Sequence, residues 1–251
     1  MPYGLYLSAA GANAQSHRLE VLSHNLANVN TAGFKPHMAM LQSRHSGAIE
    51  RGEAMAGSGT VDDIGGGILI NAAKTQFAQG TIQPTGTKTD FAINDKESFF
   101  TVKHGEQELL TRAGNFIFDS DGKMVTTGGD EVVSTSGSAI RINPTRAYQI
   151  TGDGAVLQDG TRQLPKIVKP REMGDLSRVG ENLFESLTQV AEVPNEQRSV
   201  ISGALESSGV EPTGAMMQLI EASRTYEANV RMIQTQDEAM GQLISRVLRQ
   251  G

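Results

Sequence analysis

Cysteine and tryptophan are both absent from this 251-residue chain. Without cysteine, the chain can form no disulfide bond, no thiolate metal site and no cysteine nucleophile. Aromatic residues make up only 5% of the sequence, whereas glycine occurs 28 times. Because ligand pockets usually depend on aromatic walls, this composition favours an extended, turn-rich protein over a compact enzyme.

Long apolar runs and clustered positive charge are also missing. No apolar run approaches the ~18 to 20 residues that a membrane-spanning helix requires. The first residues, MPYGLYLSAAGANAQ, lack the positively charged start of a secretory signal peptide, which indicates a protein that stays in the cytosol or leaves by a route without cleavage. The formal net charge of -6 gives no basic face for phosphates, so we expect no nucleic-acid partner.

Helical periodicity is present at both ends of the chain. From about Tyr3 to Asn28, apolar or small residues recur at helical spacing: Leu5, Ala9, Ala12, Ser16, Leu19 and Leu26, with Leu22 beside them. A second series begins after Thr213: Met216, Leu219, Ser223, Tyr226, Val230, Ile233, Asp237, Met240, Ile244 and Val247. Alternating steps of three and four average 3.5, the period of a coiled-coil seam. The second helix would be roughly 50 to 55 Å long, so it would need partners outside this chain.

The central sequence has the period of β-strands. Residues 65–193 contain short alternating runs that are broken by turn signals, and Asp-Gly pairs predict hairpins at Asp121-Gly122, Asp153-Gly154 and Asp159-Gly160. We therefore expect an α+β protein with an all-β outer domain inserted between two terminal helices. Residues 36–64, which have no clear period, are expected to form a flexible connector. Residues 194–211 are expected to form a return linker.

Three asparagines end the first helical segment in the stretch HNLANVNTAGFK. Asparagine is unfavourable inside helices because its amide competes for backbone hydrogen bonds, but it suits helix ends and turns. Asn25, Asn28 and Asn30 are therefore expected to hold an elbow by bonding exposed backbone groups. Simple capping of the helix C-terminus is the alternative.

Candidate catalytic and metal-binding patterns are weak. The histidines lack the close spacing of a helical metal site: His17, His24, His37, His45 and His104. The DSDG stretch from Asp119 lacks the further ligands of an EF-hand and is interpreted as a hairpin turn. Gly65-Gly66-Gly67 lacks the ending of a phosphate-binding loop. We therefore expect no enzyme activity, no metal and no cofactor.

Four ordered sequence blocks resemble the bacterial flagellar axial family, which comprises rod and hook proteins. They are HNLANVNTAGFK, the β-region pair FAINDKESFFTV and LLTRAGNFIFDSDGKMVTTGG, the exit GENLFES, and ALESSGVEPTGAMMQLIEASRTYEANVRMIQTQDEAM. The resemblance covers essentially the whole chain except residues 36–64. Within the family, the opening and the C-terminal block look most like proximal-rod members, with distal-rod members next.

The resemblance implies a structural subunit of the basal-body rod that assembles by helical stacking around a central export channel. It implies an inner coiled-coil domain built from residues 1–35 and 212–251. Implied partners are other copies of the chain, neighbouring rod proteins and, during secretion, the flagellar type III export apparatus. Periplasmic location and export without a cleaved signal peptide are also implied, with no small-molecule substrate.

Assembly would then depend on the terminal helices and the elbow. The residues expected at the assembly interface are Leu5, Leu19, Leu22, Asn25, Leu26, Asn28, Asn30, Phe34, Leu219, Tyr226, Val230, Ile233, Met240 and Val247. Two polar residues in the C-terminal series, Ser223 and Asp237, either set the register between helices or face the channel or solvent. Since the exposed helices would be an apolar liability in solution, we expect them to be largely disordered in the free monomer.

Two hypotheses from other functional classes remain as alternatives. A cell-wall hydrolase or carbohydrate-binding β domain would need paired carboxylates in a cleft, and the candidates are Glu106, Glu108, Asp119 and Asp121. A cytosolic coiled-coil adaptor is the other, and cell fractionation would separate it from a rod protein.

Overall fold

The computed structural model describes residues 3–53, 55, 57, 65–180 and 182–249. They belong to two compact units. Unit 1 is drawn from residues 1–27, 37–75 and 211–251, and unit 2 from residues 28–36 and 76–210. The α+β class expected from the sequence is confirmed, with long helices at both ends and antiparallel strands between them.

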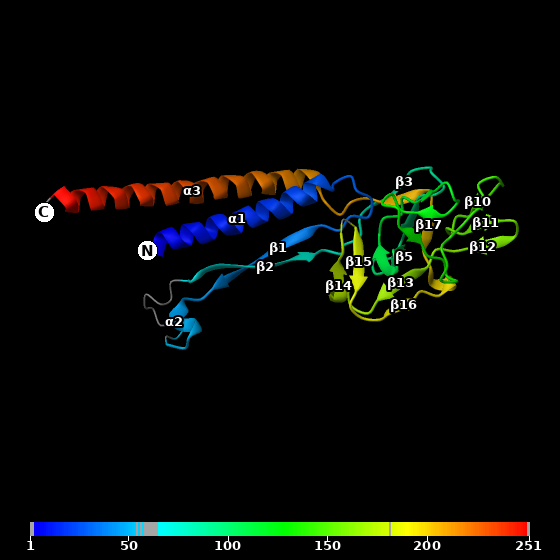
Figure 1. Cartoon of the computed structure of the whole chain (residues 1–251), viewed down its shortest axis with the longest axis horizontal. Helices are drawn as coiled ribbons and strands as arrows, with labels where there is room; N and C mark the ends of the chain where they lie inside the picture. The colour runs from blue at the N-terminus through cyan, green and yellow to red at the C-terminus, as the bar shows by residue number, and fades with distance from the viewer. Residues whose placement is uncertain (1–2, 54, 56, 58–64, 181, 250–251) are drawn as a thin grey trace. The chain divides into compact units, whose positions relative to one another are not determined.

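Two long helices form most of unit 1. Helices α1 (Tyr3–Ala27) and α3 (Pro212–Arg249) lie side by side (Figure 1). Small residues are fully buried on both helices, Ala14 on α1 and Ala222 on α3. A Cβ atom on Gly11 would lie only 3.0 Å from Asn229 Oδ1. The small residues of the first helical segment therefore allow the two backbones to approach closely.

A hairpin completes unit 1. Strands β1 (His37–Arg44) and β2 (Gly67–Thr75) pair antiparallel and pack on α1. The short helix α2 (Gly47–Glu50) follows β1, with Ser46 as its N-cap. The structure thus differs from the sequence expectation, because ordered elements occupy much of the expected connector and β2 pairs with β1 instead of joining the outer β domain. Residues 54, 56 and 58–64 of that connector lie outside the described residues.

Unit 2 consists of short antiparallel strands and two 3₁₀ helices. The strands are β3 (Ile82–Pro84), β4 (Phe91–Ile93), β5 (Phe99–His104), β6 (Gln107–Thr111), β7 (Ile117–Phe118), β8 (Met124–Val125), β9 (Glu131–Val132), β10 (Gln149–Ile150), β11 (Val156–Gln158), β12 (Thr161–Gln163), β13 (Ile167–Pro170), β14 (Leu176–Arg178), β15 (Leu183–Ser186), β16 (Val190–Glu192), β17 (Val200–Ser202) and β18 (Ala204–Glu206). The 3₁₀ helices span Met173–Asp175 and Asn195–Gln197.

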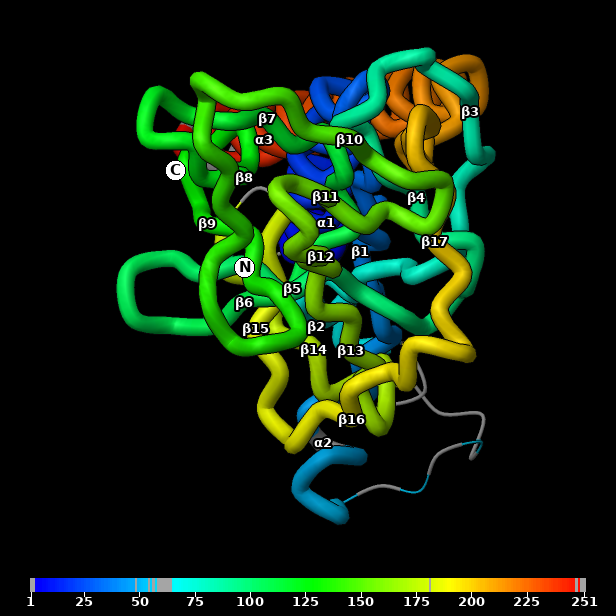
Figure 2. The backbone as a smooth tube through the Cα atoms, turned by 90° about the vertical axis from the view of Figure 1, so that its right-hand side faces the viewer, coloured from blue at the N-terminus to red at the C-terminus, as the bar shows by residue number. Residues whose placement is uncertain are grey.

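Most of these strands belong to one sheet. Its order is β14-β15-β6-β5-β9-β8-β7, and β13 pairs with both β5 and β16. Strands β10, β11 and β12 form a separate three-stranded sheet (Figure 2), while β17 pairs with β4 and β18 with β3. One apolar core gathers side chains from many of these strands, including Phe91, Phe100, Phe116 and Val156. A smaller core lies around Phe99 and Phe184.

The three Asp-Gly hairpins are confirmed. Asp159 and Gly160 have φ angles of 49° and 79° between β11 and β12, as a type I′ turn requires. Asp153-Gly154 joins β10 to β11. In the DSDG turn, Asp119 Oδ1 accepts hydrogen bonds from the backbone N–H of Asp121 (2.9 Å) and Lys123 (2.7 Å), so this carboxylate stabilises its own turn.

The expected return linker also differs from the structure. Strands β17 and β18 lie within it, and Val200 is part of the core of unit 2. Their partners, β4 and β3, are more than a hundred residues earlier in the chain. Pairing at that separation involves no hairpin turn, and three-residue strands show almost no periodicity, so the local sequence carries little signal for them.

Candidate assembly surface

Exposed apolar side chains are concentrated in unit 1. On α3 and the hairpin, the exposed large apolar residues are Met216, Met217, Ile220, Tyr226, Met232, Met240, Leu243, Ile244, Leu248, Met38, Met40, Leu41, Ile68 and Leu69. In the described part of unit 2 they are Ile117, Tyr148, Val179, Leu187 and Ile201. Apolar exposure on this scale marks surfaces that bind other proteins. We call the exposed apolar residues of α3 and the hairpin the assembly surface.

The register of the helix pair shows where α3 loses its partner. A Cβ on Gly4 would lie 3.0 Å from the Gln236 side chain, so the start of α1 lies opposite this part of α3. At the other end of the pair, Arg18 Nη2 lies 4.0 Å from Glu221 Oε2. Beyond Gln236, α3 continues to Arg249, roughly three and a half further turns. Figure 1 shows this extension of α3 past α1.

The apolar face of α3 continues along this extension. Ile233, which is half-buried, is followed seven and eleven residues later by Met240 and Ile244, spacings that keep side chains on one helix face. Met240 is 39% exposed and Ile244 is 55% exposed. Beside α1 this face is half-buried at Ile233 and 37% exposed at Tyr226, and beyond α1 it is exposed at both described positions. We call residues 237–249 the α3 extension.

The residues expected at the interface are distributed unevenly. Leu5, Leu19, Leu26, Leu219, Val230 and Ile233 are half-buried, Leu22 is buried, and Tyr226 and Met240 are exposed. The side chain of Val247 lies outside the described residues. Ser223 is half-buried and Asp237 exposed. Three buried residues of α1 and α3 were absent from the interface expectation, namely Ala14, Ala215 and Ala222. Periodicity counts alanine weakly, although its small size is what permits close approach.

The elbow residues are held within the chain. Asn25 Nδ2 donates to His37 O at 2.7 Å, and His37 N donates to Asn25 Oδ1 at 2.9 Å, which confirms backbone bonding for Asn25. Asn28 Oδ1 accepts from Thr31 Oγ1 at 3.1 Å, whereas Asn30 is exposed. Phe34 is completely buried in unit 2. It therefore anchors the elbow in its own chain and offers no surface to a neighbour.

Part of the assembly surface was missed by periodicity. Met217, Ile220 and Met232 on α3 lie outside the predicted seam but are all more than half exposed. The hairpin residues were missed because their segment lacks a clear period. The detectable signal was the density of methionine in these segments, since flexible methionine is common at protein-binding surfaces.

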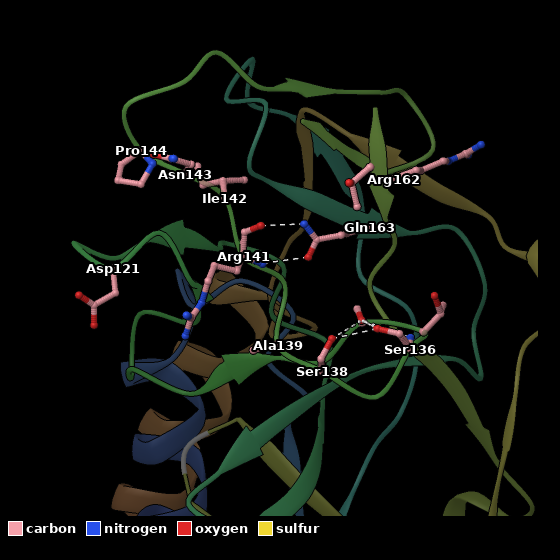
Figure 3. Close-up of a pocket in the computed structure, with 13 residues that line it drawn as sticks. Asp121, Ser136, Ser138, Ala139, Arg141, Ile142, Asn143, Pro144, Arg162 and Gln163 are labelled. Carbon is pink, nitrogen blue, oxygen red and sulfur yellow. Dashed lines mark hydrogen bonds between the residues drawn. The ribbon is translucent and has the colours of Figure 1, made fainter. Parts of the chain in front are cut away.

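A depression in unit 2 offers polar groups that already bond to one another. Ser134, Ser136 and Ser138 form a hydroxyl cluster, with Oγ atoms of adjacent members 2.7 and 2.9 Å apart. Gln163 exchanges two hydrogen bonds with the backbone of Arg141, at 3.0 and 2.7 Å. Figure 3 shows these contacts with Asp121 at the margin. Nothing in this arrangement positions a general acid opposite a base.

The other carboxylates considered for hydrolysis have structural contacts. Glu108 Oε2 lies 2.8 Å from Lys166 Nζ, Glu106 is exposed in the turn between β5 and β6, and Asp119 bonds its own hairpin. Among the described residues, no group of three metal-ligating side chains converges. Within the same residues, every helix is too short or too polar to cross a membrane.

Comparisons with known proteins place the whole chain beside flagellar rod proteins. Residues 5–35 match the family described as flagella basal body rod protein, residues 92–158 the flagellar hook protein FlgE/F/G D1 domain, and residues 201–246 the flagellar basal body rod FlgEFG protein C-terminal family. The rod protein FlgG of Bacillus subtilis is 32% identical, over 96% of this chain and 97% of the relative. FlgG of Agrobacterium fabrum is 32% identical over 98% and 99%. FlgF of Caulobacter vibrioides is 27% identical over 98% of each chain.

Proposed function

Since the chain belongs to the flagellar basal-body rod family, we propose that unit 1 joins this structural rod subunit to neighbouring copies and sister subunits. The observation that carries this proposal is the concentration of exposed apolar side chains on α3 and the hairpin. Covering them would gain about 25 cal/mol per Å² of apolar area removed from water. Neighbouring subunits would bind the α3 extension and the outer face of α3, and would complete a coiled-coil layer around a channel.

We also propose a proximal-rod position. The FlgF relative aligns over 249 residues, within the length of this chain, whereas the two FlgG relatives align over 261 and 263 positions. The FlgG alignments therefore include insertions relative to this sequence, and the length supports the FlgF-like position. Percentage identity is higher for the FlgG relatives, so the distal rod is the second candidate.

Export without cleavage of a leader belongs to the same proposal. Gly4 already packs against Gln236, so removal of an N-terminal segment that contains it would shorten the helix pair. We propose that the chain is secreted by the flagellar type III apparatus with this segment retained. Its place would then be the periplasmic part of the basal body.

Deletion of residues 213–251 tests the role of unit 1. This deletion removes α3 but leaves all of unit 2, whose residues end at 210. We expect a soluble chain with a folded unit 2 that is absent from isolated basal bodies and does not restore motility to a strain lacking the native protein. The matched control is Leu187→Ser, at an exposed apolar residue of unit 2, which should restore motility. Recovery of the truncated chain in functional rods would overturn the proposal.

A further inference from the structure

Three charged side chains are buried together in unit 2, apart from the assembly surface. Lys35, Arg112 and Glu206 are each no more than 2% exposed. Charged residues are seldom buried so completely because desolvation of an ion costs several kcal/mol. A cluster of three must therefore be held by strong compensating contacts.

Each of the three comes from a different part of the chain. Lys35 belongs to the elbow, Arg112 follows β6, and Glu206 ends β18. Lys35 Nζ lies 2.6 Å from Glu206 Oε1, and Arg112 Nη1 lies 3.3 Å from Glu206 Oε2. Glu206 is thus the common counter-ion of two cations that lie far apart in the sequence.

Neutral hydrogen-bonding groups complete the surroundings of Lys35 and Glu206. Lys35 Nζ also donates to Ala78 O at 2.8 Å, and Gly80 N donates to Glu206 Oε1 at 2.8 Å. The backbones meet at the same place, since Gly33 N donates to Glu206 O at 2.7 Å and Gly209 N to Phe34 O at 2.9 Å. The entry and exit segments of unit 2 are therefore joined where the charges lie.

The cluster carries more positive than negative charge. Within the described part of the chain, Arg112 Nε and Nη2 are buried without a hydrogen-bond acceptor. Burial is the largest cause that lowers the pKa of both Lys35 and Arg112, and Glu206 opposes it at each. Asp95 is a further carboxylate whose charge favours protonated Arg112. Without Glu206, two desolvated cations would face each other.

We propose that Glu206 acts as a latch for unit 2, which means that its carboxylate neutralises both Lys35 and Arg112. The elbow and the end of β6 can therefore be buried together only after β18 has joined the folded unit. The core of unit 2 then closes in one cooperative step that requires both its entry segment, 28–36, and its exit segment, 204–210. The inference does not depend on rod assembly. It predicts that the elbow, β18 and the central strands β5 and β6 unfold together, in a single opening reaction of the native protein.

Native-state hydrogen exchange of the full-length chain, followed by mass spectrometry in low concentrations of denaturant, tests the latch. In the wild-type chain, peptides from 28–36 and 204–210 should open with the same free energy as peptides from β5 and β6. Glu206→Gln removes the charge with little change in shape. We expect on the order of 100-fold faster exchange in both segments, since breaking a buried ion pair is strongly destabilising. Glu108→Gln, in the exposed pair with Lys166, is the matched control and should leave exchange unchanged.

A second substitution distinguishes charge compensation from general packing. Lys35→Met in the Glu206→Gln background removes one of the two buried cations that have lost Glu206, so it should slow exchange again by on the order of ten-fold. Faster exchange in the double variant, or wild-type exchange in Glu206→Gln, would overturn the proposal.

If Glu206→Gln yields no folded protein, Lys35→Met alone is decisive, because it leaves Arg112 and Glu206 as a balanced pair. Its elbow should keep opening together with the core, and separate opening of the elbow would overturn the latch.

Discussion

At the scale of single residues, the elbow sequence NTAGFK is explained by unit 2. Phe34 is buried, and Arg178 Cζ lies 4.7 Å from the centre of its ring, a distance at which the cation is attracted to the aromatic face. Asn182 Nδ2 donates to Ala32 O at 2.8 Å. Gly33 has φ +65°, and a Cβ there would lie 2.3 Å from Arg112 O. Each of these contacts holds the elbow in place within unit 2.

Gly33→Ala should destabilise unit 2 by at least about 2 kcal/mol, because strain at positive φ alone costs about 1 to 3 kcal/mol. The clash with the backbone of Arg112 adds to this cost. Gly105→Ala is the control, since Gly105 has φ +62° but no atom within 4 Å of the added Cβ. Urea denaturation followed by far-UV circular dichroism measures both changes. Equal losses in the two variants would contradict a role for close packing at Gly33.

Lys35 gives unit 2 an unusual pH dependence. Its pKa is lowered from 10.5, chiefly because burial removes Nζ from water. In the window between the lowered pKa and 10.5, the unfolded chain binds more protons than the folded chain, so the free energy of unfolding rises with pH. Deprotonation of Lys35 would leave Arg112 and Glu206 as a balanced pair.

The free energy of unfolding of the wild-type chain should therefore increase relative to that of Lys35→Met as the pH is raised toward 10.5. Denaturation curves of both proteins at several pH values in this window provide the measurement, and the subtraction removes contributions from other groups. A difference that falls with rising pH would show that Glu206 raises the pKa of Lys35 above its ordinary value.

At the scale of elements, the sequence predicted those whose signal is local. The long helices show sustained periodicity, and the hairpins around Asp121-Gly122, Asp153-Gly154 and Asp159-Gly160 carry their own turn residues, so all were predictable. Strand β1 was missed because its partner β2 follows more than twenty residues later. Strands β17 and β18 were missed because they pair with β4 and β3 across most of unit 2.

The α3 extension leads to a prediction for one residue. Ile244→Asp should remove the subunit from rods and abolish motility, because it places a charge on the face that continues beyond α1. Ile244 is 55% exposed, so the free energy of unfolding should change by less than about 0.5 kcal/mol. Gln242→Asp introduces the same charge at an exposed polar position of the same helix and is expected to remain motile. Normal rods with Ile244→Asp would show that this face remains open to solvent.

At the scale of the whole molecule, the sequence predicted which elements carry exposed apolar side chains better than which residues those are. Periodicity identified the terminal helices, and Leu219, Val230 and Ile233 are half-buried there. It could not separate contacts within the chain from faces left open, because an apolar side chain looks the same in sequence whether α1 or another subunit covers it. Phe34 shows the same difficulty, since a conspicuous aromatic residue in the elbow is internal. Burial in the folded chain was needed to make that distinction.

The small size of the side chains that are fully buried on α1 and α3 leads to the last prediction. The fully buried side chains of the two helices are alanines, Ala14 and Ala222, which have little apolar area to remove from water. At about 25 cal/mol per Å², they offset only part of the backbone entropy of ordering, which is about 1 to 2 kcal/mol per residue. Most helix stability in proteins comes from tertiary packing, and the large apolar side chains of α3 are only half-buried or exposed. We therefore expect rapid amide exchange throughout α1 and α3 in the purified monomer, with slow exchange in the core strands of unit 2. The same helical peptides should become protected in assembled rods. Slow exchange of α1 and α3 in the free chain would mean that the helix pair is already stable before any neighbour binds.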